Sequence, residues 1–277
     1  SRFQNRLNPV NNYRSALHYH STTAMPTNLA TIRHLFIYPV KSMRGLPVTE
    51  AHLGLNGILG DRRYAFVRRE LAGANAFPWM TGRTKPRMIL YTPRFAHAPT
   101  PADADPPIVV TTPDGDEFDV GDARLRERLE ADARCDLFLL KTGRGNYDSQ
   151  HLSLFNLLSL RQLEMESGEP IDLRQFRANI YLDPSDSMPF TEDGWLGHIV
   201  QIGGAVVGVT KKDTRCMMIT LDPQSAAPHP NVLRAVVRQH NEQAGIYANV
   251  IAPGVVRVGD TMRVIARAGV TNASYED

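Results

Sequence analysis

Short runs of β-branched and aromatic residues, each closed by glycine or proline, recur along most of this chain. The clearest case is the segment 198–210, in which two apolar runs flank Gly203-Gly204. Two such runs around a Gly-Gly pair predict a β-hairpin. These glycines do not resemble a dinucleotide-binding loop, because no helical pattern follows the second run. Many short strands and few helices therefore predict a β-rich α+β fold of barrel type rather than a doubly wound sheet.

The same reasoning predicts further strands along the chain. A hairpin is expected where two of them flank the turn at Pro113-Asp114-Gly115. The expected strands are 32–38, 47–52, 64–67, 108–112, 117–120, 135–140, 152–155, 176–182, 245–251, 255–258 and 262–265.

Three amphipathic segments predict helices. The first follows Asp122, which is a good N-terminal cap. The second begins at Ser159, which has capping-box spacing, and ends at Gly168. The third covers residues 231–239 and is expected to turn Val237 toward the core.

A polar loop over residues 143–150 divides the chain into two halves. We expect one domain at 25–145, a second at 146–267 and a polar tail at 268–277. Residues 1–24 contain three arginines and no acidic residue. Such a composition indicates a disordered leader, either a transit-like segment or an artificial extension.

The composition excludes several classes of protein. A formal net charge of +2 gives no reason to expect a nucleic-acid partner. No apolar run reaches the roughly 18 residues that a membrane-spanning helix needs. Two cysteines are too few for a disulfide framework or a four-cysteine iron–sulfur site, and they favour a reducing compartment. We expect a cytoplasmic protein, or a mitochondrial one if the leader is a native transit segment.

One of the two cysteines lies in a distinctive stretch. Cys216 follows Arg215 and two lysines, between runs at 206–210 and 217–221 that both have the pattern of strands. Neighbouring positive charges favour the thiolate, which is a nucleophile and a soft metal ligand. A free cysteine is also commonly inert packing, and the residues alone leave both interpretations open. The other cysteine, Cys135, opens an apolar run and is expected in the core.

Basic and hydroxyl residues also follow the predicted strands of the first half. Lys41, Ser42 and Arg44 come after the first strand, and Arg62 precedes a later one. Such side chains can hold a phosphate, because arginine binds it through a fork, lysine as a point charge and serine through its hydroxyl. They can equally be solvated loop charges, and the residues alone do not decide.

Several segments together resemble the MOSC family, the molybdenum cofactor sulfurase C-terminal domain, preceded by its N-terminal β-barrel domain. The resemblance covers residues 32–265 and is strongest to the group of the mitochondrial amidoxime reducing component and its bacterial relatives. Its motifs, in chain order, are Tyr38–Ser42, Gly60–Arg62, Asp148-Ser149 with Ser159-Leu160, Phe176–Asn179, Thr214–Cys216 and Val256–Asp260.

The resemblance implies a molybdenum cofactor, a molybdopterin whose metal takes one cysteine thiolate from the protein. Cys216 matches that ligand and would be the catalytic residue. Molybdopterin is anionic, so basic side chains suit it. The positions matching cofactor-binding residues of the family are Lys41, Ser42, Arg62, Ser149, Arg177, Asn179, Thr214, Arg215 and Tyr247.

The chain also departs from the family pattern. Ala178 replaces a proline, and Gln150 and His151 replace a small residue and a proline after Ser149. The resemblance assigns no role to residues 68–88, although they include a basic cluster.

The implied function is an oxidoreductase that reduces N-hydroxylated substrates such as amidoximes, hydroxylamines or N-hydroxylated bases. Electrons would come from a separate protein of ferredoxin, flavin reductase or cytochrome b5 type, because the chain carries no motif for such a centre. The alternatives are a molybdenum cofactor carrier or sulfur-transfer module without substrate reduction, and a cofactor-free β-barrel scaffold.

Overall fold

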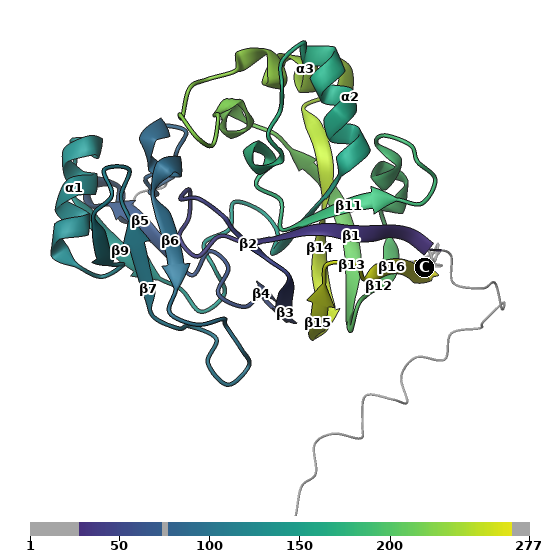
Figure 1. Cartoon of the computed structure of the whole chain (residues 1–277), viewed down its shortest axis with the longest axis horizontal. Coiled ribbons are helices and arrows are strands. Elements are labelled where there is room, and N and C mark those ends of the chain that lie inside the picture. The colour runs from purple at the N-terminus through teal and green to yellow at the C-terminus, as the bar shows by residue number, and fades with distance from the viewer. Residues whose placement is uncertain (1–27, 74–76, 268–277) are drawn as a thin grey trace, which may run out of the picture.

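A computed structural model describes residues 28–73 and 77–267 of the chain. The expectations for residues 1–24 and 268–277 therefore lie outside the described residues. Within the described ranges the chain forms a closed seven-stranded barrel, three smaller sheets and three α-helices (Figure 1). The predicted β-rich α+β fold is confirmed. No helix in these ranges is both long and apolar enough to cross a bilayer.

The barrel closes because its first strand pairs with two strands from late in the chain. Around the barrel the order is β11-β10-β14-β13-β12-β16-β1, and β1 returns to β11. Only β10 and β11 run parallel among these pairs. The strands are β1 (Asn28–Ile37), β10 (Leu152–Asn156), β11 (Ile180–Pro184), β12 (His198–Ile202), β13 (Ala205–Thr214), β14 (Gln243–Ala252) and β16 (Thr261–Arg267).

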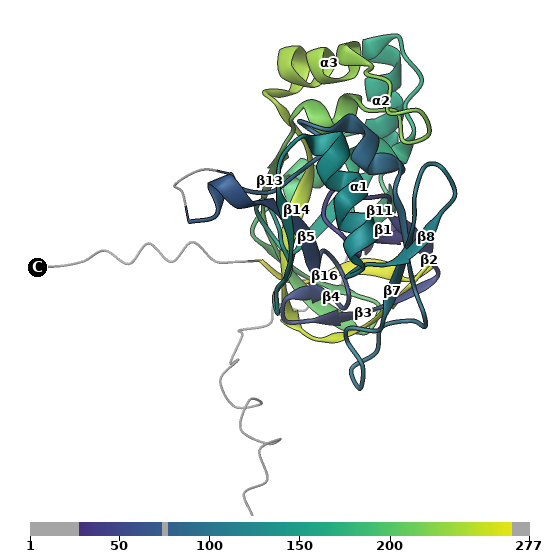
Figure 2. The same ribbon diagram turned by 90° about the vertical axis from the view of Figure 1, so that its left-hand side faces the viewer.

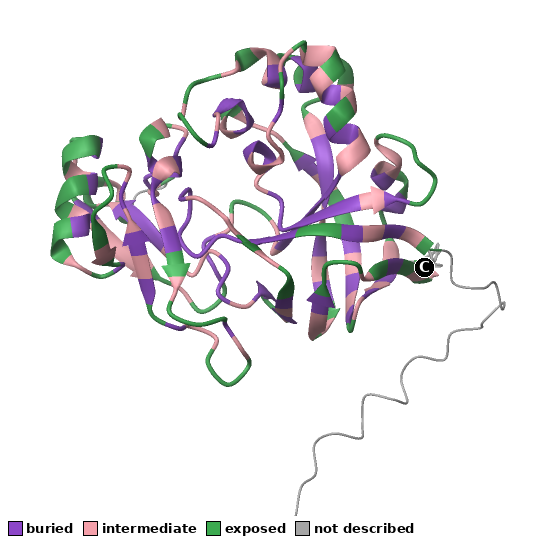
Figure 3. Ribbon diagram, in the orientation of Figure 1, coloured by how far each residue is buried: buried purple, intermediate pink, exposed green. Residues whose placement is uncertain are grey.

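The barrel interior is a continuous apolar core. Side chains alternate along each strand, so every second residue points inward. Ile32, Leu154, Val207 and Ile246 come from four different strands and are fully buried in this core. Burying such a side chain stabilises the fold by roughly 1.5–3 kcal/mol. The buried segments run along the barrel strands in Figure 3.

The remaining strands form small sheets beside the barrel. β2 extends the barrel sheet from β1, and the others pair as β15-β3-β4, β5-β9 and β6-β7-β8. The predicted turn at residues 113–115 joins β7 to β8. These strands are β2 (Leu46–Val48), β3 (Glu50–Gly54), β4 (Gly57–Ile58), β5 (Tyr64–Arg68), β6 (Thr92–Phe95), β7 (Ile108–Thr111), β8 (Glu117–Asp119), β9 (Leu137–Lys141) and β15 (Gly254–Arg257).

A second core lies under helix α1 (Ala123–Ala133). Asp122 caps the helix as predicted, because its carboxylate accepts a hydrogen bond from the Arg124 N–H. Leu125 and Leu129 are buried in the same apolar cluster as Val110 of β7. Cys135 is only half-buried at the margin of this core, so its predicted core position holds in part.

Helices α2 (Leu157–Ser167) and α3 (Pro230–His240) lie side by side at one end of the barrel (Figure 2). The predicted start of α2 at Ser159 is wrong. Asn156 caps the helix by accepting from the Leu158 N–H, and the Ser159 hydroxyl donates to Glu192 at 2.9 Å. The predicted inward face of α3 is also shifted, since Val237 is 42% exposed.

The run 217–221 is not a strand, contrary to its pattern. Met217–Thr220 forms a 3₁₀ helix whose Ile219 and Thr220 are buried. The Gln175 side chain donates to the Ile219 carbonyl at 2.8 Å, which ties this helix to the segment before β11. The preceding strand ends at Thr214, opposite Gln243. Residues 217–220 therefore pack against helices rather than pair in a sheet, and Leu221 forms an isolated bridge with Pro228.

Candidate functional site

A cavity of about 360 Å³ lies where the ends of β13 and β14 face the loops of the first half. Each of the site residues predicted from the sequence lines it. These residues are Lys41, Ser42, Arg62, Ser149, Arg177, Asn179, Thr214, Arg215, Cys216 and Tyr247.

Lys41 belongs to the tight turn that follows β1. Its ammonium donates to the Asn146 carbonyl at 2.6 Å and to Asp148 at 2.5 Å. It also lies 4.8 Å from the centre of the Trp79 ring, an attractive cation–π distance. Burial lowers the pKa of Lys41 to about 8, although Asp148 opposes the shift. The neighbouring Ser42 has a left-handed backbone, with φ of 66°.

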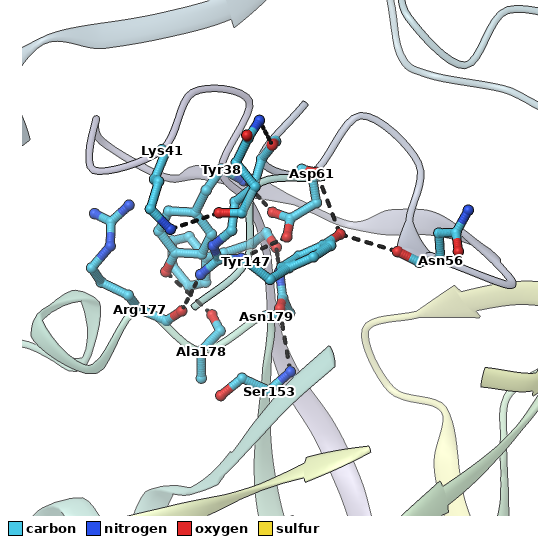
Figure 4. Close-up of polar contacts among 12 residues, drawn as sticks. Tyr38, Lys41, Asn56, Asp61, Tyr147, Ser153, Arg177, Ala178 and Asn179 are labelled. Carbon is cyan, nitrogen blue, oxygen red and sulfur yellow. Dashed lines mark hydrogen bonds and ion pairs between the residues drawn. The ribbon is translucent and has the colours of Figure 1, made fainter. Parts of the chain in front are cut away.

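Arg62 is held in place by a buried ion pair. Asp61, which is fully buried, accepts from the Tyr38 N–H at 2.7 Å (Figure 4). The Asp61 carboxylate also pairs with Arg62 at 2.5 Å. The second Arg62 amino group donates to the Arg177 carbonyl at 3.0 Å. Burial alone would lower the pKa of Arg62, but the Asp61 carboxylate raises it above its usual value. Arg62 is therefore a fixed positive charge.

Arg177 and Asn179 come from the turn that leads into β11. The guanidinium of Arg177 lies 4.5 Å from the centre of the Tyr38 ring, and burial lowers its pKa to about 10. Its Nη2 atom is buried without a hydrogen-bond partner among the described residues. The Asn179 side chain accepts from the Ser153 N–H at 3.3 Å and so joins the turn to β10. A buried guanidinium with an open donor fits an anionic ligand.

Arg215 forms the opposite wall. Its guanidinium donates to the carbonyls of Ala244 at 2.7 Å and Phe176 at 2.8 Å. Close approach of β14 makes this possible, because Gly245 has φ of 80° and a Cβ there would lie 3.0 Å from Arg215 Nη2 and 2.7 Å from the Phe155 ring. Glycine is therefore required at this position.

Cys216 follows directly and is half-buried at the cavity wall. It precedes the first residue of the 3₁₀ helix Met217–Thr220. Arg83 reaches toward it from the loop between β5 and β6. Burial lowers the pKa of Arg83, but interaction with Asp148 and with Cys216 raises it above its usual value. Arg83 thus brings a positive charge close to the thiol.

Some lining residues had no predicted role. Arg83 belongs to the basic cluster at 80–87, which was visible in the sequence but had no partner there. Asp213 directly precedes the Thr214–Cys216 motif. Its carboxylate accepts from the Ser153 hydroxyl at 3.3 Å and lies 2.9 Å from Arg215 Nη2. Asp148, in a family-like motif, is the counterion of Lys41 and Arg83.

The charges of the cavity favour an anion. Six cationic side chains line it against two carboxylates, Asp148 and Asp213. Within residues 28–73 and 77–267, no three or more His, Cys, Asp or Glu side chains are grouped to hold a metal ion. A metal here would need ligands beyond the protein, with Cys216 as the available soft donor. These residues fit an anionic cofactor that carries its own metal ligands.

Two family models and two curated relatives match most of the chain. The family model of the MOSC N-terminal beta barrel domain matches residues 29–146, and that of the MOSC domain matches residues 141–263. The mitochondrial amidoxime-reducing component 1 of Xenopus laevis is 24% identical, over 86% of this chain and 83% of the relative. The protein of the same name from Mus musculus has the same identity and coverage.

Among solved structures, the YUAD protein from Bacillus subtilis is 17% identical with a TM-score of 0.48, over 87% of this chain and 98% of that one. The predicted domain division between residues 145 and 146 stays a prediction, and β1 from the first half completes the barrel of the second. Since the two family models together span residues 29–263 in the expected order, this chain belongs to the MOSC family.

Proposed function

We propose that this chain is a molybdenum-cofactor-dependent oxidoreductase that reduces N-hydroxylated compounds. The observation that carries the proposal is a thiol and a buried, open guanidinium in one cationic cavity, namely Cys216 and Arg177. The names of the Xenopus and mouse relatives supply the reaction class.

Different residues hold the metal and the pterin of the cofactor. Cys216 is the protein ligand of the metal. Lys41, Ser42, Arg62 and Arg177 hold the anionic part of the pterin, since they are cationic or hydroxyl side chains of the cavity lining. Ser149, Asn179, Thr214, Arg215 and Tyr247 complete the binding site. When bound, the cofactor supplies the two-electron chemistry, and the protein supplies orientation and charge.

Electrons then come from a separate donor protein. The chain has two cysteines in all, too few for a cysteine-bound iron–sulfur cluster of its own. We expect the purified protein with NADH alone to show no turnover, and activity to appear when a ferredoxin, flavin reductase or cytochrome b5 type donor is added. Turnover by the purified protein with NADH alone would contradict this.

The first test is the molybdenum content of protein made in a host that synthesises the cofactor. We expect near-stoichiometric metal in the wild type and little in Cys216→Ala. Cys135→Ala is the matched control, because it removes the other thiol at the margin of a different core, and it should keep the metal. Molybdenum in neither wild type nor control would leave a cofactor-free scaffold, and full metal in Cys216→Ala would refute the ligand assignment.

The second test is the reduction of benzamidoxime with reduced viologen as an artificial electron donor. The wild type should form benzamidine, whereas Cys216→Ala should not. A wild type that holds molybdenum but reduces no amidoxime or hydroxylamine would instead be a carrier or sulfur-transfer module.

A further inference from the structure

The cationic side chains of the cavity outnumber its carboxylates. In the described part of the chain, the lining cations are Lys41, Arg62, Arg83, Arg177, Lys211 and Arg215. The lining carboxylates are Asp148 and Asp213. The cations that already have a carboxylate partner within the chain are partly compensated, so the remaining ones are the charges most open to a ligand.

The cations contributed by the first half of the chain are paired. Asp148 pairs with both Lys41 and Arg83. Asp61, which is buried and does not belong to the lining, pairs with Arg62 at 2.5 Å. These pairs hold the three side chains in place and offset part of their positive charge.

The second half leaves two cations without a carboxylate. Arg215 is paired, because Asp213 lies 2.9 Å from its Nη2 atom. Arg177 and Lys211 have no carboxylate partner within residues 28–73 and 77–267, and they differ in depth. The Nη2 atom of Arg177 is buried, whereas Lys211 is an exposed residue. The buried guanidinium suits an enclosed cofactor, and the exposed ammonium suits a ligand that enters from solvent.

Lys211 is directed toward the cavity by its place in β13. It lies opposite Tyr247 of β14, and its ammonium is 5.7 Å from the centre of the Tyr247 ring, a cation–π distance. The next residue, Lys212, pairs with Asp193 and does not line the cavity. Successive side chains of a strand point to opposite faces, which explains why only one of the two lysines faces the cavity.

We propose that Lys211 determines substrate specificity by binding an anionic group, such as a carboxylate or phosphate, carried by the N-hydroxylated substrate. The inference rests on the proposed function, because the N-hydroxyl group has to reach the metal that Cys216 holds. Cys216 and Lys211 line the same cavity, so one substrate can meet both. A cleft lined by cations attracts anions and repels cations. The substrates are therefore anionic N-hydroxylated compounds, and cationic ones are disfavoured.

Three benzamidoximes test this preference, because they share the reducible group and differ in charge. They are neutral benzamidoxime, anionic 4-carboxybenzamidoxime and cationic 4-(trimethylammonio)benzamidoxime. The molybdenum-loaded protein is assayed for kcat and KM with reduced viologen as the donor. Binding of each compound is measured by calorimetry without a reductant, so that it is independent of turnover. Substituents also change the reactivity of the N–O bond, and this contribution cancels when a variant is compared with wild type.

The variants are Lys211→Gln, which removes the charge, and Lys211→Glu, which reverses it. Lys212→Gln is the matched control, because it removes the same charge from the adjacent residue of the same strand, outside the cavity lining. Molybdenum content is measured in all four proteins. Lys211 is exposed, so both of its variants are expected to fold and to keep the metal.

We expect the wild type at low salt to bind the anionic compound more tightly than the neutral one, roughly 5-fold, as for two unit charges in contact in water. The difference should lie in KM, since a remote group bound equally in ground and transition state leaves kcat unchanged. Lys211→Gln should lose the preference, and Lys211→Glu should favour the cationic compound. Lys212→Gln should keep the wild-type preference. High salt should weaken the preference, because exposed charges are screened.

The possible failures are distinguishable. A wild type that reduces none of the three compounds overturns the proposed function. An active wild type whose charge preference is absent, or unchanged in both Lys211 variants, overturns only the specificity role. An equal loss of preference in Lys212→Gln overturns it as well, because net charge would then be the cause. Loss of molybdenum from Lys211→Gln would assign Lys211 to the cofactor instead and would also overturn the specificity role.

Discussion

The two walls of the cavity shift the pKa of a carboxyl group in opposite directions. On the wall built by loops, Asp148 of the segment 143–150 is 39% exposed and paired with Lys41 and Arg83. On the wall built by β13 and β14, Asp213 is almost fully buried and its carboxylate lies 2.9 Å from Arg215 Nη2. Burial opposes the ionisation of Asp148, but Lys41 and Arg83 hold its pKa below the usual range. Burial raises the pKa of Asp213, although Arg215 opposes this shift.

Position in the fold therefore decides the direction of the pKa shift of each carboxyl group. The loops contribute long cationic side chains, which can form ion pairs with a carboxylate such as that of Asp148. Strand ends bring short side chains into a site that water enters poorly, where a charge costs more.

The largest effect should follow from breaking the buried ion pair under the loop wall. Asp61→Ala leaves the Arg62 guanidinium without its counterion and frees the Tyr38 N–H. We expect a loss of about 3–5 kcal/mol in the free energy of unfolding, measured by urea denaturation. Asp193→Ala, which breaks a pair with both side chains 33% exposed, should cost less than about 1 kcal/mol. Equal losses in the two variants would contradict a special role for the Asp61–Arg62 pair.

Lys41 should make the stability of the cofactor-free protein depend on pH. Burial chiefly lowers its pKa from 10.5 to about 8. Between these values the unfolded chain binds more protons than the folded one, so the free energy of unfolding rises with pH. Relative to Lys41→Met, the wild type should gain up to about 3 kcal/mol between pH 7 and pH 10.5, by urea denaturation. Parallel pH curves for the two proteins would rule out a buried, depressed lysine.

The two carboxylates should respond to amide substitution with opposite pH dependence. Asp148 has a lowered pKa, so its contribution is present near neutral pH and is lost as pH falls through that pKa. Asp148→Asn should therefore cost about 1 kcal/mol at pH 7 and less in acid. Asp213 has a raised pKa, so its contribution is present in acid and is lost as pH rises through that pKa. Relative to wild type, Asp213→Asn should gain stability with rising pH in urea denaturation. If the stability differences of both variants changed with pH in the same direction, the opposite pKa shifts would be contradicted.

The smallest effect should come from the hydroxyl that supports Asp213. Ser153→Ala removes a donor 3.3 Å from its carboxylate. The change in the free energy of unfolding should stay within about 1 kcal/mol, but the Asp213 pKa should rise further. ¹³C NMR titration of cofactor-free protein detects this shift, and Ser159→Ala, whose hydroxyl serves Glu192, is a control that should leave Asp213 unchanged.

Much of the fold could be predicted from local patterns. Gly203-Gly204 predicted the β12–β13 hairpin, and Asp122 predicted the start of α1. Local sequence patterns gave wrong predictions where contacts with residues distant in the sequence determine the secondary structure. The apolar run 217–221 resembles a strand, yet its partners are helices and the Gln175 side chain. Ser159 has the pattern of a helix cap, yet its hydroxyl donates a hydrogen bond to the buried Glu192.

The site shows the same division. Residues within motifs, such as Lys41 and Cys216, could be predicted from a family resemblance, and the structure brings them to one cavity. Arg83 could not, because it lies in a loop that carries no motif and meets Cys216 only through the tertiary fold. Asp213 has no visible signal either, since its burial depends on β10 and β14, which lie far from it in the sequence.

The closure of the barrel by β1 has a consequence for synthesis on the ribosome. β1 is made first among the described strands, yet one of its two barrel neighbours, β16, is made last. Until β16 emerges, β1 and β12 each keep an open edge, and an open edge is a template for pairing with other chains. Translation through this interval is therefore the period of greatest aggregation risk, and we expect holdase chaperones to engage nascent chains that lack β16.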